Sequence, residues 1–153
     1  MKNHLVTNFD YQLYDLNKNN IVLGEWCIPY SSKNKFKKYF IKIANPYGYT
    51  KLQADDDYRL CFDIFNKISK SIFKILNNFH GVNFSERQWL ILISSWLHRY
   101  ICIAINRYKT INECLNQYDI DSISFYNDKN YSLSVNNTYE FIKSSNDSIW
   151  NNI

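Results

Sequence analysis

The sequence predicts an α/β domain with a small, mostly parallel sheet and two long helices. Short apolar runs come first, at His4–Asn8, Ile21–Leu23 and Phe40–Ala44. Two long segments with apolar residues at three- and four-residue steps follow, and another apolar run, Ile120–Tyr126, comes near the end. Strands interrupted by helices typically form a parallel sheet with helical crossovers. The order of the strands is not predicted.

Length and composition limit the class of protein. A chain of 153 residues is about one ordinary domain. Its 46% hydrophobic and 18% aromatic residues exclude a disordered chain. The net charge of +4 lacks the dense basic clusters of a nucleic-acid binder, so we expect no nucleic-acid partner. We place the domain at residues 1–126 and a polar tail, with at most one helix over 137–143, at residues 127–153.

The first long helix is predicted over Lys51–Phe79. Thr50 and Gln53 form a capping box at its beginning, and Gly81 suits its end. Its apolar residues recur with the helical period, which predicts an amphipathic helix. The stripe consists of Tyr58, Cys61, Phe65, Ile68, Ile72, Ile75 and Phe79.

The second helix is predicted to begin at Ser85, because Gln88 completes a second capping box. Its stripe ends on a charge and consists of Trp89, Ile93, Trp96, Tyr100, Ile103 and Arg107. A third capping box, Thr110 with Glu113, predicts a separate short helix to about Tyr118.

Absent motifs exclude several classes. The four cysteines are widely spaced and form no zinc pattern, so we expect reduced thiols, no metal and a cytoplasmic protein. Ser94, Ser95, His98 and Arg99 interrupt the most apolar window, which favours a buried helix over a membrane span. The sequence contains none of the Walker, G-x-G-x-x-G, G-x-S-x-G and H-E-x-x-H motifs. The usual sequence evidence for a kinase, a hydrolase or a metalloprotease is therefore absent.

The sequence IVLGEWC is the first candidate site, because ligands gather at the carboxyl ends of parallel strands. Gly24 permits close approach, Glu25 can accept a proton or bind a sugar hydroxyl, and Trp26 offers an aromatic surface. The structural alternative is a turn glycine, a solvated carboxylate and core side chains. Cys27 is a weaker nucleophile candidate, since no base is assigned to it.

Basic residues supply the other candidates. His80 can act as a base or bind phosphate, or simply satisfy helix-terminal carbonyls. Arg87 opposes the dipole of the second helix, which an anionic partner would justify; the alternative is an exposed arginine. Arg107 either binds an anion or forms an internal salt bridge. The lysine-rich segment 33–38 is either a solvated loop or a contact for a membrane surface.

Several blocks in this order resemble the N-terminal region of a family of bacterial transferases from O-antigen and other surface-polysaccharide gene clusters. The blocks are LVTN, LGEWC, the long helix, HGVNFSERQWLILISSWL and NRY. The resemblance covers roughly Leu5 to Phe125, with Asn8 in place of a second threonine. It implies a Rossmann-like, acceptor-side domain of a glycosyltransferase-like enzyme whose donor-binding half lies in a later domain, so the chain is expected to be inactive alone.

The resemblance directs attention to seven residues without assigning their roles. In a complete enzyme, Glu25 or His80 would be the catalytic base, and the substrate-binding residues would be Trp26, Arg87, Trp89, Trp96 and Arg107. The implied donor is a nucleotide-activated sugar, not bound by this chain alone. The implied partners are a carbohydrate or lipid-linked acceptor, a separately encoded donor domain and the inner face of the membrane. The alternative function is a non-catalytic interaction module that retains the fold and pairs with a separate partner.

Overall fold

The computed structural model describes residues 1–28, 30, 33–48, 50–124, 135 and 137–144. The chain divides into two compact units. The first, here called the sheet unit, comprises Met1–Tyr47 and Arg107–Ile153. The second, the hairpin unit, comprises Gly48–Asn106. The boundary that we predicted near residue 126 lies outside the described residues and stays a prediction.

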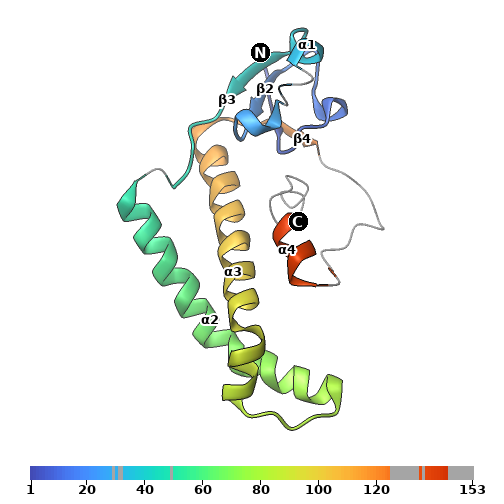
Figure 1. The fold of residues 1–153 in the computed structure, drawn as a ribbon. Coiled ribbons are helices and arrows are strands. Elements are labelled where there is room, and N and C mark those ends of the chain that lie inside the picture. The colour runs from blue at the N-terminus through green and yellow to red at the C-terminus, as the bar shows by residue number, and fades with distance from the viewer. Residues whose placement is uncertain (29, 31–32, 49, 125–134, 136, 145–153) are drawn as a thin grey trace. The chain divides into compact units, whose positions relative to one another are not determined.

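The sheet unit contains a four-stranded parallel sheet with strand order β3-β2-β1-β4, which confirms the predicted fold class (Figure 1). The strands are β1 Asn3–Val6, β2 Asn19–Val22, β3 Phe40–Ile43 and β4 Ser122–Ser124. All four fall within or beside the predicted apolar runs. Residues 125 and 126 of the last run lie outside the described residues.

The central strands carry the core of the sheet unit. Leu5, Val6, Ile21 and Val22 are fully buried, as expected where a parallel sheet is covered on both faces. Asn20 is also fully buried because its side chain replaces missing backbone partners: it accepts from the Asp15 N–H and donates to the carbonyls of Asp15, Lys18 and Phe40.

The hairpin unit begins with α2, Lys51–His80, which ends one residue after the predicted end. The predicted capping box forms: the Gln53 N–H donates to Thr50 Oγ1, and the Gln53 side chain accepts from the Thr50 N–H. Gly81 ends the helix in the left-handed conformation, with φ 63°, and its N–H donates to the Asn77 carbonyl.

The second helix, α3, runs over Glu86–Gln117, and Figure 1 shows it joined to α2 by a short turn. The predicted capping box at its beginning forms between Ser85 and Gln88. The separate helix predicted from Thr110 is wrong, because Thr110 lies inside α3. Neither glycine nor proline occurs between Ser85 and Gln117, so nothing breaks the helix before the new capping pattern, and continuing it needs no new nucleus.

The two helices pack through a compact apolar cluster. Cys61 and Phe65 on α2 are buried with Leu97 and Ile101 on α3. This buried face differs from the predicted α3 stripe, because Trp96 in that stripe is 36% exposed. Apolar residues occupy several faces of α3, and periodicity alone does not tell which of them faces α2.

Two short helices complete the sheet unit. The lysine-rich segment that we read as a loop contains one helical turn, α1, Lys33–Phe36. In the predicted tail, α4 spans Thr138–Ser144 and confirms the one helix expected there. Asn137 caps it, since its side-chain oxygen accepts from the Glu140 N–H.

Candidate functional site

The carboxyl edge of the sheet holds the main candidate site. From β1 the chain moves outward on one side to β2 and then β3, whereas β4 pairs with the other side of β1. Such a reversal leaves a crevice beyond the carboxyl ends of the two strands that flank it, which is where α/β proteins bind ligands. In this chain the two strands are β1 and β4, whose last residues Val6 and Ser124 lie in register.

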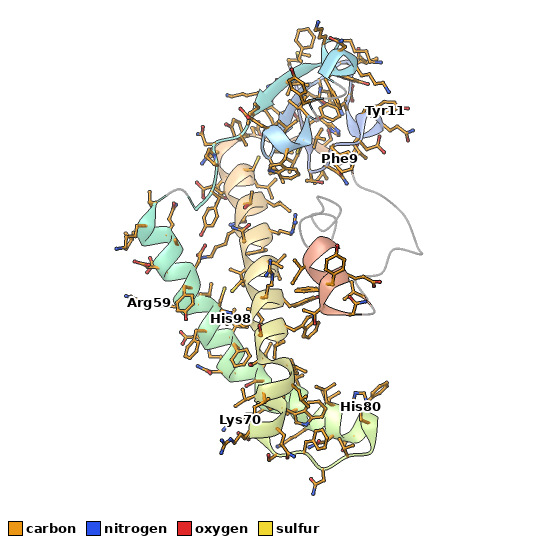
Figure 2. All side chains as sticks on the ribbon, in the orientation of Figure 1. Phe9, Tyr11, Arg59, Lys70, His80 and His98 are labelled. Atoms are coloured by element: carbon orange, nitrogen blue, oxygen red, sulfur yellow. The ribbon has the colours of Figure 1, made fainter. Side chains whose placement is uncertain are left out.

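Thr7 and Asn8 also lie at this edge of the sheet, and our sequence reasoning did not select them. Both polar side chains follow β1 directly and are fully buried. Asn8 also accepts a hydrogen bond from the Phe9 N–H, which fixes the start of the next segment, where Figure 2 labels Phe9 and Tyr11. Their signal was present in the LVTN block, because polar residues that end an apolar strand mark the ligand edge of a parallel sheet.

Glu25 and Trp26 lie at the same edge, as predicted from IVLGEWC. They belong to a short 3₁₀ helix, Glu25–Cys27, that begins three residues after β2 ends. The buried Cys27 points back to β1, with Sγ 3.9 Å from the Val6 carbonyl oxygen. This contact holds the Glu25–Cys27 turn against the end of β1, while Glu25 stays exposed and Trp26 is 48% exposed.

The Cys27 thiol is poorly placed to act as a nucleophile, because it is fully buried. Its burial raises its pKa to about 12, so the thiol remains protonated at neutral pH. The neighbouring Tyr14 hydroxyl donates to the Cys27 carbonyl at 2.8 Å, and burial also raises the pKa of Tyr14. These two side chains therefore fix the turn and leave proton transfer to other groups.

Gly24 is required by the position of the Trp26 ring. Its backbone is extended, so no unusual dihedral angle demands glycine here. A Cβ atom at this position would instead lie 2.5 Å from Trp26 Nε1 and 2.8 Å from Cδ1. The indole thus lies directly over the Gly24 backbone, so the space beside this glycine is taken by the chain's own Trp26, and the approach of a ligand stays a prediction.

His80 and Trp89 lie in the hairpin unit, beside the turn that joins α2 to α3. Figure 2 labels His80 at the end of α2, and its ring centroid is 6.2 Å from that of Trp89. Trp89 is buried: its Nε1–H donates to Asn77 Oδ1 at 2.8 Å, and its ring packs on Phe84. Asn77 also exchanges two hydrogen bonds with the Phe84 backbone. Trp89 therefore stabilises the turn between α2 and α3.

The three remaining candidates are spread along α3. Arg87 is exposed in the first turn, in the hairpin unit. Trp96 lies two helical turns after Trp89 and packs on Tyr100, with ring centroids 5.6 Å apart. Arg107 is partly buried and belongs to the sheet unit. The seven predicted residues thus divide between units: Glu25, Trp26 and Arg107 lie in the sheet unit, and the other four in the hairpin unit.

A second polar network joins the other end of the sheet. His4 Nδ1 lies 2.9 Å from Ser122 Oγ, His4 Nε2 lies 2.9 Å from the Leu13 carbonyl, and Lys18 Nζ donates to Ser122 Oγ. Lys18 also forms a salt bridge with Asp15, whose pKa is lowered mainly by the Asn17 N–H. With every ring nitrogen of His4 partnered, this network reads as a structural link between β1 and β4.

Two features of the described residues bear on metals and membranes. Among them, no group of three or more histidine, cysteine, aspartate or glutamate side chains is placed to hold a metal ion. One described helix, α3, is long and apolar enough to cross a membrane by length and composition, and 17% of its apolar window is buried.

The fold defines an α/β protein with a four-stranded parallel sheet and two long helices. The family model described as LIC12162 family transferase matches residues 3–153. The chain therefore belongs to this transferase family. No curated protein and no solved structure matches it.

Proposed function

We propose that the chain forms the acceptor side of a sugar-transfer site at the carboxyl edge of its sheet. The observation that carries the proposal is the pair Glu25 and Trp26, which is exposed at an edge where Thr7, Asn8 and Cys27 are fully buried. A carboxylate beside an aromatic surface suits a carbohydrate, because the ring stacks while the carboxylate accepts a hydrogen bond from a hydroxyl group.

In the proposed step, the Glu25 carboxylate accepts the proton of an acceptor hydroxyl. The acceptor oxygen then bonds to the anomeric carbon of the donor sugar, and the nucleotide leaves with the bonding electron pair. Trp26 holds the acceptor ring in position for this attack. The donor is a nucleotide-activated sugar, bound by a donor-binding domain distinct from this sheet.

The finer parts of the proposal concern the substrate and its location. We place the enzyme in surface-polysaccharide synthesis, with a carbohydrate or lipid-linked acceptor at the inner face of the membrane. Support comes from the resemblance of the blocks LVTN, LGEWC and NRY to transferases of such gene clusters, and from the transferase family to which the chain belongs.

Saccharide binding and sugar transfer test the proposal together. In isothermal calorimetry with oligosaccharides from the native surface polysaccharide, we expect Trp26→Ala to abolish binding and Glu25→Gln to preserve it. In transfer assays with a sugar-nucleotide panel and the donor partner, we expect Glu25→Gln to lower the rate by about 10²- to 10⁴-fold. Glu86→Gln, an equally exposed change in the hairpin unit, is the control.

A folded chain that neither binds these oligosaccharides nor supports transfer would contradict the proposal. The alternative of a non-catalytic interaction module would then gain support, provided that a separately encoded protein binds the chain.

A further inference from the structure

The hairpin unit exposes large apolar side chains on both helices. Ile75 and Phe79, one turn apart on α2, are 64% and 81% exposed. On α3, Ile91 is 75% and Leu92 60% exposed. Single exposed apolar residues are normal on soluble proteins, whereas several on one element mark an interaction surface.

An apolar groove of 460 Å³ runs between the two helices. Leu92 lies one turn before Trp96 of its lining, whereas Ile91 lies on the opposite side of α3 from Tyr100. Ile68 and Ile72 line it from α2, and Trp96 and Tyr100 line it from α3. Ile75 continues the α2 face, since it lies three residues after Ile72. We call this surface, the groove with its flanking residues, the groove face.

Positive charge lies to the side of the groove face. The hairpin unit has seven lysine or arginine and five aspartate or glutamate side chains. Over residues 64–106, the part that lines the groove, it has five basic side chains and one carboxylate. The basic residues are Lys67, Lys70, Lys74, Arg87 and Arg99, and the acidic one is Glu86. The three lysines recur at three- and four-residue steps and are exposed, so they form a row along α2.

We propose that the α2–α3 hairpin docks on an anionic lipid bilayer through its groove face. Apolar and aromatic side chains enter the boundary between headgroups and acyl chains, as in other interfacial amphipathic helices. Lysine side chains are long enough to reach phosphate groups from beside the apolar face. The proposal does not depend on the sugar-transfer function.

Charge favours a bilayer over a second copy of the chain. In a two-fold dimer the same surface meets itself, so the cations beside the groove face, such as Lys67 and Lys74, would lie near those of the other hairpin. Like charges placed opposite each other weaken an interface. An anionic membrane instead complements both the charge and the apolar side chains.

Charge also favours docking over insertion across the bilayer. The apolar part of α3 includes His98 and Arg99, and a central arginine is costly in a membrane span. At the interface, Arg99 stays within reach of the headgroups. The hairpin is therefore expected to lie along the membrane surface.

Vesicle sedimentation with the full chain tests the proposal. We expect the chain to sediment with vesicles of phosphatidylcholine and phosphatidylglycerol, to remain in solution with phosphatidylcholine alone, and to be released by salt. Failure to bind the anionic vesicles would overturn the proposal, whether light scattering then shows a monomer or a dimer.

Two lysine triples locate the docking surface. We expect Lys67→Gln, Lys70→Gln and Lys74→Gln, combined, to weaken binding by about a hundredfold, or about fivefold for each charge. The control triple replaces three exposed lysines of the sheet unit by glutamine: Lys35, Lys37 and Lys38. It removes the same net charge away from the hairpin and should weaken vesicle binding less than threefold. A larger loss in the sheet-unit triple would overturn the assignment to the hairpin.

Exposed apolar residues provide an independent test that spares the core. We expect Ile75→Ser with Phe79→Ser to abolish sedimentation and to leave the circular dichroism spectrum unchanged. Leu16→Ser with Ile43→Ser, at exposed positions of the sheet unit, should bind like the parent chain. Equal binding by both double variants would contradict docking through the groove face.

Discussion

Replacement of Gly24 by alanine tests the geometry of the candidate site with a single methyl group. The new Cβ would lie 2.5 Å from Trp26 Nε1, closer than nonbonded atoms tolerate, while the extended backbone at this position accepts alanine. We therefore expect the Trp26 ring to leave its place over the backbone and the rest of the sheet unit to stay folded.

The exposure of Trp26 sets the size of the effect. The side chain is 48% exposed, so about half of an indole surface, roughly 120 Å², is buried. At about 25 cal/mol per Å², losing all of this burial would cost about 3 kcal/mol. Partial repacking and the lower chain entropy of alanine in the unfolded state reduce the expected loss to about 1–2 kcal/mol.

Nuclear magnetic resonance of the indole N–H groups is the appropriate assay. The Trp26 signal is assigned with Trp26→Phe, and Gly24→Ala should shift this signal while the buried Trp89 signal stays in place. Urea unfolding supplies the free energy of unfolding, and calorimetry should show weaker saccharide binding. An unmoved Trp26 signal with unchanged stability would refute the placement of the ring over Gly24.

The remaining predictions concern the two cores. The pKa of Cys27 is about 12 in the folded chain, above its ordinary value of 9.0, so the stability that the thiol contributes is complete below about pH 9 and is lost as the pH rises toward 12. Urea unfolding at several pH values should show that the free energy of unfolding falls more steeply with alkaline pH in the parent chain than in Cys27→Ala. Equal slopes in the two proteins would contradict this. His4→Ala removes both hydrogen bonds of the buried imidazole and should lower the free energy of unfolding by about 2–3 kcal/mol, whereas a loss below about 0.5 kcal/mol would show that the network is dispensable. Leu97→Ala removes a buried side chain and should lower the free energy of unfolding of the hairpin unit, measured by thermal unfolding, by about 2–4 kcal/mol. The control Leu92→Ala, at an exposed position, should lower it by less than about 0.5 kcal/mol. Similar losses in the two variants would mean that the buried face of α3 is misassigned.

Local chemistry in the sequence predicted most of the elements. Thr50 and Ser85 each start a helix because a side-chain oxygen and a glutamine three residues later satisfy free backbone N–H groups. Gly81 ends α2 because it adopts the left-handed conformation without a steric cost. These are short-range effects, so one sequence is enough to recognise them.

Thr110 shows where local reasoning fails. Its spacing from Glu113 fits a capping box, yet a cap forms only where the chain enters a helix, and α3 already passes through this position. The outcome depends on what precedes the motif as well as on the motif itself. The absence of glycine and proline over the preceding segment was the available signal.

The candidate site was predicted only in part, because it depends on long-range pairing. The sequence placed Glu25 and Trp26 after a strand, but the pairing of β1 with β4, residues more than a hundred positions apart, decides where the edge reverses. Thr7 and Asn8 follow an apolar run in the sequence, but without the strand order nothing placed them beside the reversal. Similarly, the spacing between Glu25 and His80 gave no hint that they belong to different units.

A saccharide titration of the isotope-labelled chain tests the central claim most directly. If the carboxyl edge of the sheet binds the acceptor, the backbone signals of Thr7, Asn8 and residues 24–27 should shift with saturable concentration dependence, and Trp26→Ala should remove these shifts. Shifts confined to the hairpin unit, or none at saccharide concentrations that saturate the transfer reaction, would contradict the account.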